Sequence, residues 1–311
     1  MTLPIDYAIQ EVKGIKESYD NGQKNVLEQY KDSRMFGFYT TSEVSEIFTS
    51  TESMEGIKEL SLLETPPTLT LEDGYSVTLT EKRFGGAISI PEATYRRAEG
   101  DATTKVPEYL SKQRDKLLMA NTAFFLRQIF TMYNEAFDST SDYLAPDSVE
   151  ICGTHSWKTG GTFSNATTDV LSSDAIDTME EYAGAFTDPA GVPMPLNFDT
   201  IIVKKGSAAA RTAKKLFAEG INPVAVGDIN IYEGAYAIVE TPYITAANKL
   251  NWFARCNGQF MNSIVVGIGE YPTMRAPQVE KNQSVFSAVT GFWKMGIANL
   301  SFDIYGSNGT A

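Results

Sequence analysis

The sequence predicts an α+β fold, and three stretches support that prediction. Residues Thr68 to Pro91 alternate polar and apolar side chains as β-strands do. Residues Lys105 to Phe137 repeat apolar side chains at spacings of three and four, as a helix does. Residues Ser172 to Glu240 alternate helical and strand-like segments within one block. Strands, one very long helix and a separate α/β block indicate an architecture of several parts.

Composition excludes several classes of protein. The 311 residues include 26 Lys and Arg against 39 Asp and Glu, which gives a net charge of −13. This balance argues against wrapping around nucleic acid, which needs a basic face. Two distant cysteines, Cys152 and Cys256, argue against a disulfide scaffold and suit a reducing compartment. The start of the chain lacks the features of a signal peptide, and no apolar run is long enough to span a bilayer.

The N-terminal segment, Thr2 to Arg34, is polar and has few regular apolar positions. Such a segment buries too little surface to fold alone. We expect an arm with a short amphipathic helix that lies on another surface, in preference a neighbouring subunit. A frayed terminus is the alternative.

A β-hairpin is predicted next. Thr68 to Leu71 and Ser76 to Thr80 alternate around Glu72-Asp73-Gly74, where the Asp-Gly pair predicts a turn. Ala87 to Pro91 predicts a further strand. A two-stranded ribbon is marginally stable alone, so we expect its apolar face to pack on its own domain or on a neighbouring subunit.

The long helix is expected to begin at Pro107, because the missing N–H of proline has no partner in a first turn. No Gly or Pro follows until Pro146. A helix of about 31 residues would extend roughly 46 Å at 1.5 Å per residue. Since helices average about 11–12 residues, we expect this one to lie along a sheet and to join several parts of the molecule.

The α/β block has clear boundaries. Ser172 to Asp174 predicts the N-terminus of a helix over Ala175 to Phe186, and Gly206-Ser207 predicts the start of a helix ending at Ala218. Thr200 to Val203 predicts a buried strand. We expect two further strands to pair around Glu233-Gly234; these are Asn230 to Tyr232 and Tyr236 to Glu240.

The C-terminal region predicts a return of strands and then a flexible tail, Gly306 to Ala311. Two prolines exclude Glu270 to Pro277 from a central strand. The expected strands are Trp252 to Ala254, Ile264 to Ile268, Ser284 to Phe292 and Ala298 to Tyr305.

No catalytic constellation is visible. The single histidine, His155, lies in a loop rich in Gly, Ser and Thr and is expected on the surface. A site of several histidines is therefore impossible, and a Ser-His-Asp triad would depend on this residue. Lys204 and Lys205 could hold a phosphate at a helix N-terminus, but a helix capped by Ser207 explains the same residues and is preferred. We predict no catalytic, cofactor-binding or metal-binding residue and no enzyme.

The order of these parts resembles one family. A polar arm, an extended hairpin returning through KRFGGAISIP, a very long helix, an α/β block and a return of strands are similar to the Hong Kong 97-like major capsid proteins of tailed bacteriophages. The stretch SVFSAVTGFWKMGIANLSFDIYGS is similar to Mu-like head subunits. The resemblance implies an N-terminal arm and entry strand over 1–59, an E-loop hairpin over 60–91, a P domain with its spine helix over 92–163, an A domain over 164–250, P-domain return strands with a projecting loop over 251–295, and a C-terminal strand and tail over 296–311.

The resemblance also implies a function. The chain would assemble as hexamers and pentamers into an icosahedral shell that encloses double-stranded DNA without sequence-specific binding, with portal, scaffolding and decoration proteins as partners. It would assemble in the bacterial cytoplasm and reside in the virion. The arm begins near Met1, which implies that scaffolding is a separate protein or absent. Contacts between subunits are expected at Glu72, Asp73, Lys82, Arg83 and Arg275.

Two alternatives remain open at this point. An encapsulin-like compartment shell would share the fold, whereas an α/β enzyme is disfavoured by the single histidine and the missing motifs. Some members of the resembled family join an E-loop lysine to an asparagine of a neighbour. No lysine lies between Glu64 and Glu81, and Lys82 is expected near the subunit body. We therefore predict a shell without this cross-link.

Overall fold

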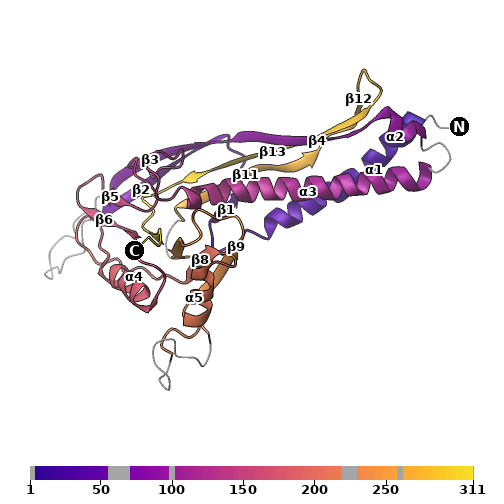
Figure 1. The fold of residues 1–311 in the computed structure, drawn as a ribbon. Coiled ribbons are helices and arrows are strands. Elements are labelled where there is room, and N and C mark those ends of the chain that lie inside the picture. The colour runs from indigo at the N-terminus through magenta and orange to yellow at the C-terminus, as the bar shows by residue number, and fades with distance from the viewer. Residues whose placement is uncertain (1–3, 55–70, 98–101, 219–229, 258–261, 311) are drawn as a thin grey trace, which may run out of the picture.

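The computed structural model describes residues 4–54, 71–97, 102–218, 230–257 and 262–310. The subunit is elongated (Figure 1), with a long sheet and two long helices on one side and a smaller α/β unit on the other. The predicted α+β class is confirmed. The elements of the long part are α1 (Pro4–Glu28), β1 (Gly37–Thr40), β4 (Lys82–Ile90), α2 (Glu92–Arg97), α3 (Ala102–Asn134), β11 (Ile264–Met274), β12 (Gln278–Val279) and β13 (Val285–Ile297).

The central strand of the long sheet is β13. It pairs antiparallel with β4 on one side and with β11 and then β12 on the other, and β11 pairs in parallel with β1. The helix α3 runs along this sheet (Figure 1). Its length of 33 residues confirms the predicted long helix, although it begins before Pro107, which lies inside it. The C-terminal half of α3 packs between the two sheets through Phe125, Ile129 and Phe130.

The N-terminal segment corrects one prediction. In place of the expected short helix, it forms a helix of 25 residues, α1, which packs on α3 and β11 of its own chain. Ala8, Val12 and Tyr19 are buried in a cluster with Ile88 of β4 and Val289 of β13. The sequence pattern was too sparse to show this, because only one narrow stripe of α1 is apolar.

The hairpin is also placed differently from the prediction. The strands β2 (Ser45–Met54) and β3 (Leu71–Thr80) form an antiparallel two-stranded ribbon. Glu72, Asp73 and Gly74 lie inside β3 and do not form its turn. The connection between the strands, residues 55–70, lies outside the described residues and contains Lys58. The absence of a lysine between Glu64 and Glu81 therefore no longer supports the prediction of a shell without the cross-link.

The second sheet has the order β7-β14-β10-β8-β9. The predicted helix caps are confirmed, because the hydroxyls of Ser172 and Ser207 accept hydrogen bonds from the backbone N–H groups of Ala175 and Ala210. The elements of this unit are β5 (Thr154–Ser156), β6 (Thr162–Ser164), β7 (Ala166–Thr167), α4 (Ser173–Ala185), β8 (Thr200–Lys204), α5 (Ala208–Leu216), β9 (Ala237–Thr241), β10 (Trp252–Arg255) and β14 (Ile304–Ser307).

One predicted strand of this unit, Asn230 to Tyr232, is wrong, and so is its predicted pairing with Tyr236 to Glu240. Residues 231–234 form a turn, because the side-chain amide of Asn230 donates to the carbonyls of Leu216 and Ala218 at the end of α5. The strand β9 pairs in parallel with β8 instead. The sheet also contains β10 and β14, whereas the sequence analysis placed these strands in the C-terminal region, apart from the α/β block.

Two C-terminal predictions are corrected as well. The strand β11 extends beyond its predicted end at Ile268 and through Pro272. At Pro272, β1 no longer pairs with β11 and the register to β13 shifts, so this proline lies outside a central strand, as predicted. The final strand is Ile304–Ser307, not Ala298 to Tyr305. Gly306 is not part of a loose tail, because a Cβ atom there would lie 2.4 Å from the sulfur of Cys152.

Candidate subunit-contact surfaces

The five predicted contact residues do not form one site. Glu72 and Asp73 lie on the ribbon strand β3, and the backbone carbonyl of Asp73 accepts a hydrogen bond from Lys158 at 3.3 Å. Lys82 and Arg83 are exposed at the start of β4, opposite β13. Arg275 follows β11 and contacts side chains of its own chain. Contact of these residues with a neighbour remains a prediction.

Arg275 is held by two side chains of the long sheet. Its guanidinium donates to the hydroxyl of Thr290 at 2.9 Å and contacts the carboxylate of Glu270 at 3.3 Å. The side chain of Arg275 is still 49% exposed, so a neighbouring molecule can reach it.

The base of the ribbon is anchored by a buried lysine. Lys294 of β13 is fully buried, and its ammonium donates to the carbonyl of Glu43 at 2.6 Å and pairs with the carboxylate of Glu46 at 3.2 Å. Glu46 lies near the start of β2 and also accepts hydrogen bonds from the hydroxyls of Tyr39 and Thr41. Burial raises the pKa of Glu46, but these three donors outweigh it and leave the pKa below its usual value.

Close packing also holds the base of the ribbon against the long sheet. A Cβ atom at Gly296 would lie 2.5 Å from a methyl group of Leu79, so only glycine lets β3 approach β13 this closely. Leu79 packs in a small apolar cluster with Val265 and Ala298. The ribbon is therefore attached to the long sheet at Glu46 and Leu79.

A second contact holds the middle of the ribbon. The ammonium of Lys158, between β5 and β6, donates to the carbonyl of Gly74 at 3.0 Å. The carbonyls of Asp73 and Gly74 can accept these bonds from Lys158 because the pairing of β2 with β3 is irregular there. The register shifts between Thr49, opposite Ser76, and Thr51, opposite Asp73. Figure 1 shows the ribbon passing beside the β5–β6 hairpin.

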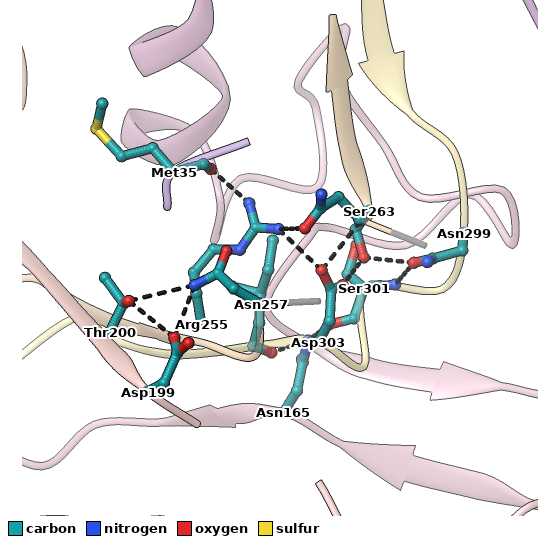
Figure 2. A network of polar contacts seen from close by, with 12 residues as sticks. Met35, Asn165, Asp199, Thr200, Arg255, Asn257, Ser263, Asn299, Ser301 and Asp303 are labelled. Carbon is teal, nitrogen blue, oxygen red and sulfur yellow. Dashed lines mark hydrogen bonds and ion pairs between the residues drawn. The ribbon is translucent and has the colours of Figure 1, made fainter. Parts of the chain in front are cut away.

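The junction between the two sheets contains a buried polar network (Figure 2). Arg255 of β10 pairs with Asp303 at 3.0 Å, and their side chains are 0% and 1% exposed. The guanidinium also donates to the carbonyl of Met35 and to the side chain of Asn262 at 2.7 Å. Asp303 accepts from the backbone N–H of Ser263 at 3.1 Å. The network thus joins β10, the turn before β14, the start of β11 and the chain after α1.

The charges of this pair depend on each other. Burial alone would lower the pKa of Arg255, but Tyr133 and Asp303 outweigh it and raise that pKa, so the guanidinium stays protonated. Burial raises the pKa of Asp303, and Arg255 and Ser263 oppose that rise. Neither group has access to water, so each is stable only with its partner.

His155 is not on the surface, contrary to the prediction. Its ring is fully buried and stacks on Phe163. One ring nitrogen lies 3.0 Å from the carboxylate of Asp147 and the other 3.2 Å from the carbonyl of Ile151. Both partners are hydrogen-bond acceptors, so the ring is held from both sides. Burial raises the pKa of Asp147, but hydrogen bonds from His155 and backbone N–H groups leave it below its usual value.

The sequence analysis missed three buried pairs, Arg255–Asp303, Lys294–Glu46 and His155–Asp147. The sequence nevertheless contains one indication of them. Arg255, Lys294 and Asp303 each stand alone among apolar neighbours in strand-like runs. A lone charge in such a run has to find a partner inside the fold. Neither their partners nor the burial of His155 could be read from local pattern.

Other classes of site are not supported by the described residues. Across the described ranges, His, Cys, Asp and Glu nowhere gather in groups of three that could hold a metal ion. Cys152 and Cys256 are buried, and neither forms a disulfide. None of the helices in those ranges is long and apolar enough to cross a membrane.

Comparison with known proteins identifies a shared fold but no relative by sequence. Neither a protein-family model nor a curated protein matches the sequence. A chain from Mycobacterium phage Patience superposes with a TM-score of 0.53 at 11% identity, covering 99% of this chain and 88% of that one. A chain from the capsid structure of the cyanophage P-SCSP1u gives a TM-score of 0.52 at 8% identity, covering 88% and 86%. The chain has the fold of a tailed-phage capsid subunit.

The superposition with the chain from Mycobacterium phage Patience extends over nearly the whole of this chain. A virus-like particle from Pyrococcus furiosus is also similar, with a TM-score of 0.47 at 10% identity and coverage of 94% and 98%.

Proposed function

We propose that this chain is the major capsid protein of a tailed bacteriophage and assembles with copies of itself into an icosahedral shell. The ribbon β2–β3 carries the proposal. Each strand has ten residues, and no third strand pairs with the ribbon within the described ranges. Val44 and Ile47 at its base are 63% and 71% exposed. A two-stranded ribbon buries too little surface alone, so a neighbouring subunit is expected to cover it.

The finer description follows from the same proposal. Subunits form hexamers and pentamers, with contacts that include Glu72, Asp73, Lys82, Arg83 and Arg275. The shell encloses double-stranded DNA, and a net charge of −13 keeps the DNA from adhering to its wall. Portal, scaffolding and decoration proteins are the expected partners. Assembly takes place in the bacterial cytoplasm, and the chain performs no catalysis.

The test is to image the purified full-length chain by electron microscopy, alone and with candidate scaffolding proteins, and to measure its sedimentation. We expect rings or closed shells. A monomer of 34.1 kDa under every salt and scaffold condition would overturn the proposal. The contents of particles from infected cells separate two shell functions: double-stranded DNA supports the capsid, whereas packaged protein without DNA supports an encapsulin-like compartment.

A further inference from the structure

In the smaller α/β unit, acidic and basic residues lie in separate stretches of the chain. From Thr159 to Val203, which includes α4, there are seven acidic residues and no Lys, Arg or His. From Lys204 to Ala218, which includes α5, there are five basic residues and no acidic one. Surfaces that face only water usually mix both signs. This separation therefore points to a charged partner.

Both helices lie on the same face of the second sheet. Met179 of α4 and Ala213 of α5 belong to one apolar cluster with Ile201 and Trp252. Ile202, which alternates with Ile201 along β8, belongs to the cluster on the opposite face. Figure 1 shows α4 and α5 together on the outer side of this unit, away from α3. Their outer faces are open to another molecule.

The exposed side chains of each helix share one sign. On α4, Asp174, Asp177 and Glu181 are exposed at spacings of three and four, so they lie on one face. On α5, Arg211 and Lys215 are exposed one turn apart. In the described part of the subunit no ion pair neutralises either face. Lys214 differs, because it pairs with Glu240 of β9.

We propose that the acidic face of α4 on one subunit contacts the basic face of α5 on the next subunit. The inference rests on the proposed function, because it needs copies of the chain side by side. The two faces are different surfaces, so the contact is head-to-tail and closes into a ring when the rotation allows. Opposite charges speed encounter and fix the register between partners. One sequence supplies both faces, so a second copy of this chain is the partner.

Charge reversal tests the contact. The variant D177K/E181K makes the α4 face basic, and R211E/K215E makes the α5 face acidic. Each should fold, as judged by circular dichroism and the cooperativity of thermal unfolding. Each should yield more than about tenfold fewer rings or shells than the wild type, because like charges now face each other. The quadruple variant carries all four substitutions and should recover assembly, because the faces are complementary again.

A mixture gives a second test that depends on ring symmetry. In an equal mixture of the two single-face variants, attraction exists only between unlike subunits. Alternating subunits close a ring of six but cannot close a ring of five. We therefore expect hexameric rings without closed icosahedral shells, which also need pentamers.

Failure of this inference can be distinguished from failure of the proposed function. If the wild type forms shells and both single-face variants assemble within about twofold of it, only the α4–α5 contact is overturned. A folded quadruple variant that does not assemble also overturns the contact. A wild type that forms no ring or shell under any condition overturns both.

Discussion

The sheet junction and the ribbon base are each held by a buried ion pair, and the two pairs differ in exposure. At the junction, Arg255 and Asp303 are 0% and 1% exposed. At the ribbon base, Lys294 is 0% exposed but Glu46 is 22% exposed. Removing one partner at the junction leaves a charge that water cannot reach. At the ribbon base, water can reach Glu46 when Lys294 is removed.

This difference in exposure indicates that the two sheets form a rigid body, whereas the attachment of the ribbon β2–β3 to that body can adjust. The two sheets are joined by charges that tolerate no rearrangement. The ribbon is joined to the body by a charge that is partly hydrated, a few apolar contacts at Leu79 and the hydrogen bonds of Lys158. In the proposed shell, one subunit has to fit both hexamers and pentamers. The ribbon is the part that can change its angle at low cost.

The largest effect is expected at the junction. The substitution Arg255→Met leaves the carboxylate of Asp303 buried without its partner. We expect a loss of about 3–5 kcal/mol of unfolding free energy or a failure to fold. Chemical denaturation followed by circular dichroism measures this loss. The double variant R255M/D303N should recover part of it, and a loss below about 1 kcal/mol in R255M alone would show that the junction is no more sensitive than the surface.

His155 should behave like the junction, because its partner Asp147 is also almost fully buried, at 2% exposure. The substitution His155→Ala removes a ring stacked on Phe163 and leaves the carboxylate without its nearest donor. We expect a loss of about 2–4 kcal/mol. Thermal unfolding of H155A beside H155A/D147A measures it. A melting temperature equal to that of the wild type would be inconsistent with this buried site.

The sequence predicted well where a residue acts locally. Ser172 and Ser207 cap their helices because a hydroxyl needs only the next turn of backbone. The long helix was found because its apolar repeat continues over 33 residues. The long helix expected from the resemblance is present, whereas the ribbon pairs β2 with β3 and does not turn at Glu72-Asp73-Gly74.

The sequence failed where distant residues decide the outcome. Asp73-Gly74 has the composition of a turn, yet β2 pairs with β3 on both sides of it, and this pairing overrides the local preference. The strand β11 extends beyond its predicted end and through Pro272 because β1 has already ended there. His155 looked exposed because its partner lies in a loop eight residues earlier that carries no regular pattern.

A smaller effect is expected at the ribbon base. The substitution Lys294→Met leaves Glu46 with the hydroxyls of Tyr39 and Thr41 and with access to water. We expect a loss of about 1–2 kcal/mol with the fold retained. Amide hydrogen exchange should become faster in β2 and β3 and stay unchanged in β8 and β10. Equal acceleration in both sheets would remove the distinction between ribbon and body.

Acid should weaken the same attachment. The pKa of Glu46 is lower in the folded chain than in the unfolded chain. Its contribution is therefore present above the unfolded pKa of about 4.3 and is lost as the pH falls through the lower folded value. Hydrogen exchange of β2 and β3 should increase relative to the rest of the chain below about pH 4. The variant K294M is the control and should show a weaker pH dependence, whereas an equal dependence in both proteins would contradict the assignment.

The smallest effect is expected at the middle of the ribbon. Lys158 is exposed and, among the described residues, binds backbone carbonyls only, so water can replace it at both Asp73 and Gly74. The substitution Lys158→Met should cost about 0.5 kcal/mol or less. Its effect should appear as faster exchange confined to the amides around Gly74, with the ribbon base still protected by Lys294. The double variant K158M/K294M releases both attachments, and its effect on ribbon exchange should exceed the sum of the single effects, because either contact alone still positions the strand. Additive effects would mean that the two contacts hold the ribbon independently.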